Sequence, residues 1–138
     1  MHINYAQKTY RKTQVQTANP AGLIVLLYRG ALDRLRAAQH GFQSGDKERI
    51  NASLKSAQDI IFELMVSVDT SVDAEFSLGL LRLYEYMNHR LVRANVENDI
   101  DMVEEVREIL EELLGAWSQV TEDSEKGCSG EQSVDLTI

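Results

Sequence analysis

The stretch INASLKSAQDIIFELMVSV, residues 50–68, carries a regular apolar seam that decides the fold class. Its apolar residues recur at alternating steps of three and four, the spacing that places side chains on one face of an α-helix. Asp46 precedes the stretch, where a carboxylate can accept a hydrogen bond from a backbone N–H at a helix start. The pattern predicts an amphipathic helix whose seam is Ile50, Leu54, Ala57, Ile61, Leu64 and Val68.

The same spacing predicts a helix on the N-terminal side of this stretch. Asn19 is suited to the N-cap, and Pro20 to the first helical position, where its missing N–H costs nothing. Gly41, with Ser44 and Gly45 beyond it, supplies the stop. The seam of this helix is Leu23, Leu27, Ala31, Leu35, Ala38 and Phe42.

Two further helices are expected towards the C-terminus. The apolar pattern breaks at residues 69–73, resumes, and breaks again at Asn98 or Asp99. Acidic side chains at the start of the last segment suit the positive end of a helix dipole. The third seam is Phe76, Leu80, Leu83, Met87, Leu91 and Ala94, and the fourth is Val103, Val106, Leu110, Leu113, Trp117 and Val120.

Four amphipathic segments joined by short polar loops favour an all-α fold, an antiparallel four-helix bundle over residues 19–120. Each segment spans about 20 residues, or about 30 Å as a helix. Residues 1–18 are polar with scattered apolar anchors, so we expect an N-terminal docking segment. The apolar periodicity ends at Val120, so we expect residues 121–138 to form a mobile acidic tail.

Length and composition agree with a single helical domain. The chain has 138 residues, of which 43% are apolar, and only one is a proline. Its single cysteine, Cys128, excludes an internal disulfide and has no nearby thiol or histidine with which to share a metal. We therefore expect no cofactor and no metal.

The charge of the chain argues against nucleic acid as a partner. The net charge is −8, which repels phosphate backbones, and most of the acidity lies after residue 50. The first residues lack the apolar core of a secretory signal, and the longest apolar run, Leu23–Tyr28, is far too short to cross a bilayer. We expect a cytoplasmic protein without membrane insertion.

Side chains suited to catalysis are scattered rather than grouped. Glu85 and His89 are four residues apart, but one such pair is typical of a surface contact rather than of a metal site. A histidine phosphotransfer bundle, with His89 beside Arg90 and Arg93, stays open as an alternative, although the residues after His89 match such domains poorly. We expect a protein that is not an enzyme.

Several apolar side chains are left over once the four seams are assigned. Adjacent leftovers of this kind are typical of a groove for a partner, although a wide core face would also account for them. These residues are Val25, Tyr28, Ile60, Phe62, Met65, Val66, Leu81, Tyr84 and Tyr86.

Two longer motifs resemble those of one protein family. The segment YRKTQVQTANPAGLIVLLYRGA, residues 10–31, resembles the opening of the FliS family of flagellin export chaperones. The segment LYEYMNHRLVRANVENDIDMVEEV, residues 83–106, is similar to the third-helix signature of that family, and Trp117 lies at the expected place. The matching residues are Tyr10, Val15, Thr17, Ala18, Pro20, Leu27, Tyr28, Gly30, Ala31, Leu83, Tyr84, Tyr86, Met87, Arg90, Leu91, Ala94, Asn95 and Asp99.

The resemblance implies a secretion chaperone that binds the disordered C-terminal segment of flagellin, prevents premature polymerisation and supports export through the flagellar type III export gate. It also implies that residues 1–18 cap the client groove until the client displaces them. As an alternative function, the sequence leaves open an adaptor for another amphipathic helix. It also leaves open that the protein forms a homodimer. The partner-binding residues that we predict are Ile3, Tyr5, Tyr10, Tyr28, Ile60, Phe62, Met65, Leu81, Tyr84, Met87, Leu91 and Asn95.

Overall fold

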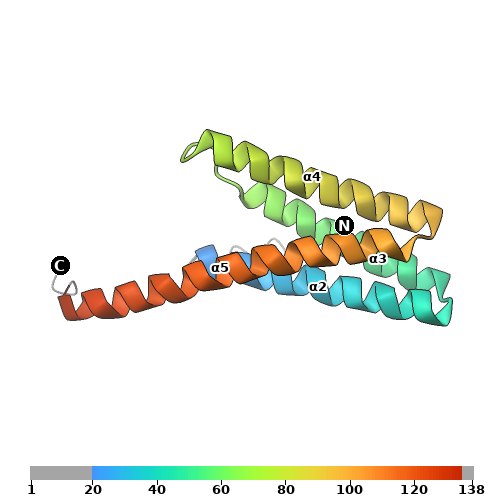
Figure 1. Cartoon of the computed structure of the whole chain (residues 1–138), viewed down its shortest axis with the longest axis horizontal. Coiled ribbons are helices and arrows are strands. Elements are labelled where there is room, and N and C mark those ends of the chain that lie inside the picture. The colour runs from blue at the N-terminus through green and yellow to red at the C-terminus, as the bar shows by residue number, and fades with distance from the viewer. Residues whose placement is uncertain (1–19, 135–138) are drawn as a thin grey trace, which may run out of the picture. The chain divides into compact units, whose positions relative to one another are not determined.

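The computed structural model describes the backbone of residues 20–134 and the side chains of residues 21–119, all of it helical apart from short connections. The helices are α2 (Pro20–Ser44), α3 (Lys47–Ser67), α4 (Ala74–Glu97) and α5 (Ile100–Val134), as Figure 1 shows. The all-α bundle that the sequence predicts is confirmed. None of the described helices is both long enough and apolar enough to cross a membrane.

The predicted helix boundaries between α2 and α5 are confirmed by local capping contacts. The Asp46 carboxylate accepts a hydrogen bond from the Arg49 backbone N–H at 3.1 Å, and Asp73 does the same for Phe76 at 3.1 Å. Gly45 and Asn98 follow the ends of α2 and α4 with φ of 69° and 55°. Glycine adopts this left-handed conformation without a steric cost, and asparagine tolerates it better than most residues.

Residues Leu27–Glu112 form one compact unit that contains most of the bundle. Hydrogen bonds between its helices show that consecutive helices run antiparallel. Asn95 Nδ2 on α4 donates to Asn51 Oδ1 on α3 at 2.7 Å, and Asn88 Nδ2, two turns earlier, donates to the Gln58 carbonyl at 3.3 Å. Similar contacts join the other neighbours, namely Arg34 with Ser56, Gln39 with Glu104 and Arg90 with Glu105.

The core of this unit contains many of the predicted seam residues, but some seam residues lie outside it and some other residues lie in it. Ile61, Leu64 and Leu110 are fully buried, as expected. Phe76 was expected on the third seam but is 60% exposed, because it lies in the first turn of α4, next to the loop and beyond the last turn of α3. Other buried core residues are Tyr28, Ala31, Leu35, Ala38, Ile50, Leu54, Ala57, Ile60, Tyr84, Met87, Leu91, Ala94, Val103 and Val106.

Two tyrosines that the sequence placed beside the core lie inside it. Tyr28 on α2 and Tyr84 on α4 are 0% and 1% exposed, and their hydroxyl oxygens are 2.5 Å apart. Burial, together with this hydrogen bond, raises the pKa of Tyr84 above its ordinary value. A buried phenol needs a hydrogen-bond partner, and here each hydroxyl serves the other.

The second compact unit combines Met1–Leu26 with Leu113–Ile138. Its described parts are the first turns of α2 and the continuation of α5 to Val134. The expectation that the last helix ends at Val120 is therefore wrong. The residues that follow are polar but include no proline, and a helix satisfies its own backbone hydrogen bonds whether or not one face is apolar. Residues 1–18 lie outside the described part of the chain.

Two glycines provide a matched test of the packing. A Cβ atom on Gly41 would lie 2.9 Å from Ile50 Cγ1 and 3.2 Å from the Ile50 backbone nitrogen, whereas one on Gly79 would meet nothing within 4 Å. We expect Gly41→Ala to lower the free energy of unfolding by about 1–3 kcal/mol through overpacking. Gly79→Ala should raise it by about 0.5–1 kcal/mol, because alanine favours a helix. Urea unfolding measures both, and a stabilised Gly41→Ala variant would contradict the close approach of α2 and α3.

Candidate functional site

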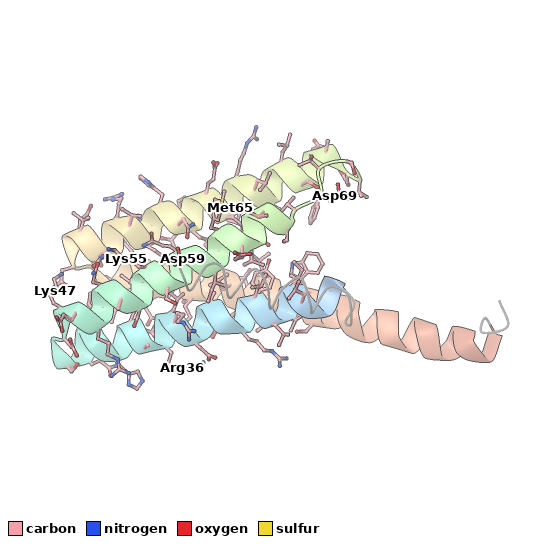
Figure 2. The ribbon with its side chains drawn as sticks, turned by 180° about the vertical axis from the view of Figure 1, so that it is seen from behind. Arg36, Lys47, Lys55, Asp59, Met65 and Asp69 are labelled. Carbon is pink, nitrogen blue, oxygen red and sulfur yellow. The ribbon has the colours of Figure 1, made fainter. Side chains whose placement is uncertain are left out.

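An open groove of about 640 Å³ runs along the surface between α3 and α4, within the unit Leu27–Glu112. Figure 2 labels Lys55, Asp59 and Met65 in order along α3, and of these Met65 lines the groove. Because α3 and α4 are antiparallel, residues near 62 on α3 lie opposite residues near 85 on α4. The groove is lined by Phe62, Met65, Arg82, Glu85, Tyr86, Asn88, His89 and Val92.

Exposed apolar side chains give the groove its hydrophobic character. Phe62 is 57% exposed and Val92 is 44% exposed, while Met65 between the helices is half-buried. Val66, one turn beyond Phe62 on α3, is 54% exposed and extends this apolar edge. Large apolar side chains that gather around one groove are typical of a protein-binding surface.

The base of the groove holds an incompletely satisfied amide. The Asn88 side chain donates to the Gln58 carbonyl, which ties α4 to α3. Its Oδ1 atom is buried and has no hydrogen-bond partner among the described atoms. A buried acceptor without a partner is unfavourable, so a donor from a bound molecule or from water would stabilise this site.

The charged residues that line the groove are uncommitted. None of the hydrogen bonds and ion pairs that the structure describes engages Arg82, Glu85 or His89. A contact between Glu85 and His89, which are four residues apart, is thus not among the described contacts. Residues 20–119 hold no group of three or more His, Cys, Asp or Glu side chains that could bind a metal ion. The Arg82 and Glu85 charges and the His89 imidazole are available to a partner rather than consumed within the bundle.

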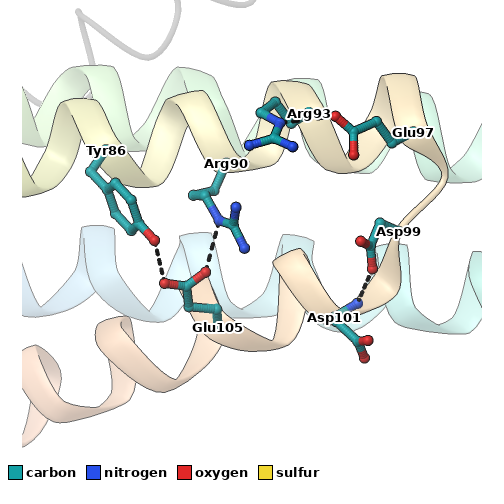
Figure 3. A network of polar contacts seen from close by, with 7 residues as sticks. All are labelled: Tyr86, Arg90, Arg93, Glu97, Asp99, Asp101 and Glu105. Atoms are coloured by element: carbon teal, nitrogen blue, oxygen red, sulfur yellow. Dashed lines mark hydrogen bonds and ion pairs between the residues drawn. The ribbon is translucent and has the colours of Figure 1, made fainter.

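The charges on the neighbouring stripe of α4 are, in contrast, engaged (Figure 3). Arg90 Nε lies 2.8 Å from Glu105 Oε1 on α5, and the Tyr86 hydroxyl donates to the other oxygen of the same carboxylate. Arg93 pairs with Glu97 at 2.9 Å along α4. The hydrogen bond to Glu105 is the main cause of a raised pKa at Tyr86. The arginines of the phosphotransfer alternative are therefore engaged in ion pairs, while His89 is exposed in the groove.

The structure divides the predicted partner-binding residues into four groups. Phe62 and Met65 line the groove, whereas Leu81 and Asn95 are half-buried and lie outside its lining. The expectation that Tyr84 is an exposed anchor is wrong, because α4 turns this side chain towards α2. Tyr28, Ile60, Met87 and Leu91 are buried in the core as well, and Ile3, Tyr5 and Tyr10 lie outside the described residues.

Sequence reasoning missed most of the α4 side of the groove. Arg82, Glu85, His89 and Val92 follow one another at steps of three or four, so they share a helix face. That spacing was available from the sequence, but three of the four side chains are polar or charged, which is typical of an ordinary solvated face. Only the position of Phe62 opposite them shows that this face borders an apolar groove.

Comparison with known proteins identifies relatives of the whole chain. The family model described as "Flagellar protein FliS" matches residues 2–124. The flagellar secretion chaperone FliS of Bacillus subtilis (strain 168) is 35% identical over 130 residues, which cover 94% of this chain and 96% of that protein.

Two further relatives carry the same description. The flagellar secretion chaperone FliSB of Pseudomonas aeruginosa is 34% identical over 125 residues, covering 88% of this chain and 99% of that protein. The flagellar secretion chaperone FliS of Salmonella typhimurium is 34% identical over 118 residues, covering 85% and 87%. In each comparison, the similarity thus covers most of this chain and most of the related protein.

Proposed function

The chain belongs to the FliS family of flagellar proteins, and from this premise we propose that it is a secretion chaperone that binds the C-terminal segment of flagellin in the groove between α3 and α4. The observation that carries the proposal is the apolar groove itself, with Phe62 and Val92 exposed on its two sides. The chaperone role rests on the relatives, while the client and the site of binding are our own proposal.

The groove suits an amphipathic helix better than a small molecule. It is open along its length and has apolar side chains from two antiparallel helices, so a third helix can pack its apolar face between them. A client segment that is disordered when free must lose conformational entropy as it folds onto the groove. That cost lowers the net affinity, which keeps the complex releasable for export.

The uncommitted charges give the client a defined position. Arg82 and His89 flank Glu85 along α4, so a client helix can match the Arg82 and Glu85 charges with its own side chains of opposite sign. Partly exposed pairs of this kind contribute little affinity but do favour one register over another. The apolar contacts therefore provide the binding energy, and the charges determine how the client lies.

Three parts of the proposal lie outside the described groove. Residues 1–18 cap the client site in the free protein and are displaced when flagellin binds. The protein acts in the cytoplasm, where it prevents premature polymerisation of flagellin. It then delivers its client to the flagellar type III export gate, and it does so without catalysis, as the family relatives described as chaperones support.

Charge substitutions on α3 and α4 test the groove with a matched control. We expect Phe62→Glu and Val92→Glu each to weaken binding of monomeric flagellin at least about tenfold, because a carboxylate replaces an apolar anchor. Val96→Glu makes the same change about one turn from Val92, at a side chain that is 79% exposed and outside the groove. That variant should bind flagellin normally. Titration calorimetry with purified flagellin measures all three.

A second titration with flagellin that lacks its C-terminal segment tests the identity of the client. We expect no binding of the shortened protein. If both groove variants bind full-length flagellin as tightly as the Val96→Glu control, the groove is not the client site. If the shortened flagellin binds normally, the C-terminal segment is not the client, and another amphipathic helix should be sought.

A further inference from the structure

Tyr86 differs from the other residues of the groove because it contacts two parts of the bundle. Its side chain lines the groove between α3 and α4 and is 43% exposed. Its hydroxyl reaches away from α3 and donates a hydrogen bond to the Glu105 carboxylate on α5 (Figure 3). One wall of the groove is therefore tied to a helix that supplies none of the groove's lining residues.

Arg90 completes the link between the two helices. Its guanidinium Nε lies 2.8 Å from Glu105 Oε1, and its Cζ lies 5.9 Å from the centre of the Tyr86 ring, within the range of a cation–π contact. The Arg90 and Glu105 side chains are only 24% and 37% exposed, so solvent screens this pair less than a fully exposed one. The Glu105 carboxylate thus accepts a hydrogen bond from the Tyr86 hydroxyl and also pairs with the Arg90 guanidinium, which lies over the Tyr86 ring.

We propose that Glu105 is a positioning residue that holds the Tyr86 ring as a preformed wall of the groove, so that α5 sets client affinity without touching the client. This inference rests on the proposed function, because it assumes that the client lies against Tyr86. It assigns to Glu105 and Arg90 a role that neither the groove lining nor the family match indicates.

The physical basis is the entropy of a partly exposed aromatic side chain. A tyrosine at a helix surface is free to occupy more than one χ1 rotamer, and a client must select the one that leaves the groove open. A hydrogen bond from the hydroxyl to a charged acceptor restricts the ring before the client arrives. Preorganisation of this kind raises affinity because less freedom is lost on binding.

The test compares Glu105→Ala with Glu111→Ala. Both variants remove a carboxylate of α5 that takes part in an ion pair. Glu111, however, pairs with Arg107 on its own helix at 2.7 Å and lies outside the groove lining. We expect Glu105→Ala to raise the dissociation constant for monomeric flagellin about three- to tenfold, the usual effect of one hydrogen bond. Glu111→Ala should leave it unchanged, because neither Glu111 nor its partner Arg107 lines the groove.

A double-mutant cycle shows whether Glu105 acts through Tyr86. In a Tyr86→Ala background, Glu105→Ala should have no further effect on the dissociation constant, because the ring that it positions is gone. An equal loss of affinity in both backgrounds would overturn the proposal, since Glu105 would then act on the client directly. An unchanged dissociation constant in Glu105→Ala would overturn it as well, provided that Phe62→Glu abolishes binding and so places the client in the groove.

A measurement without the client keeps the inference separate from the proposed function. In protein labelled with ¹³C at its tyrosine rings, Glu105→Ala should shift the Tyr86 ring signal and increase ring mobility in NMR relaxation, whereas Glu111→Ala should change neither. If Phe62→Glu binds flagellin normally, the groove is not the client site, and the claim that α5 sets client affinity fails. An unchanged Tyr86 ring in Glu105→Ala would overturn the positioning role itself.

Discussion

The substitution Tyr84→Glu is expected to unfold the bundle rather than to block client binding. The Tyr84 side chain is 1% exposed, and its hydroxyl lies 2.5 Å from that of Tyr28. Glutamate at this position would bury a carboxylate and remove a large aromatic side chain, which together cost more than about 4 kcal/mol. Because a domain of this size is stable by only about 5–15 kcal/mol, this loss removes a large part of the stability, and the variant should melt at a much lower temperature than the parent.

Thermal unfolding followed by circular dichroism measures the effect, with two control variants. Tyr84→Phe keeps the ring and removes only the hydrogen bond to Tyr28, so it should cost about 1 kcal/mol. Phe62→Glu introduces the same carboxylate at an exposed position and should leave the melting temperature nearly unchanged. A Tyr84→Glu variant that melts like Phe62→Glu would show that Tyr84 is not in the core.

Alkaline pH provides an independent check on the same tyrosine. Because burial and the Tyr28 hydroxyl raise its pKa in the folded state, Tyr84 stays protonated where an unfolded tyrosine, with a pKa of about 10, ionises. Its contribution to stability is complete below about pH 10 and is lost as the pH rises towards the folded-state value. The free energy of unfolding should therefore fall above about pH 10 in the parent, and fall less steeply in Tyr84→Phe.

Truncation of a core residue should produce the second largest effect. Ile61 on α3 and Leu110 on α5 are both fully buried on the predicted seams. We expect Ile61→Ala and Leu110→Ala each to lower the free energy of unfolding by about 2–5 kcal/mol, through lost burial and the cavity that remains.

Chemical denaturation of the truncated variants tests the register of the bundle. Val96→Ala is the control, because its side chain is 79% exposed and its removal should change stability by less than about 0.5 kcal/mol. Equal stability of all three variants would show that the helices pack with different faces inward. If only one of the two core variants lost stability, the helix that carries the other substitution would pack with a different face inward.

The sequence alone determined the helices and most of their boundaries, because these depend on local contacts. Asp46 and Asp73 accept hydrogen bonds from backbone groups three residues away, and Asn98 ends α4 in a left-handed conformation. The three-four spacing of apolar residues is equally local, so it identified the seam around Ile61 correctly. The end of α5 was missed because polar residues after Val120 remove the apolar pattern without breaking the helix.

Only the tertiary structure decided which apolar residues face the core and which face the groove. Ile60, Ile61 and Phe62 are consecutive and similarly apolar, yet the first two are buried and Phe62 is 57% exposed. The reason is that α3 has neighbours on more than one side, so the buried arc is wider than a single seam. Tyr84 is buried, and its hydroxyl has a partner there because α2 brings the Tyr28 hydroxyl opposite it. The hydroxyl of Tyr86, two residues further on, likewise has its hydrogen-bond partner on another helix, the Glu105 carboxylate of α5. No local pattern in the sequence indicates a partner that distant along the chain.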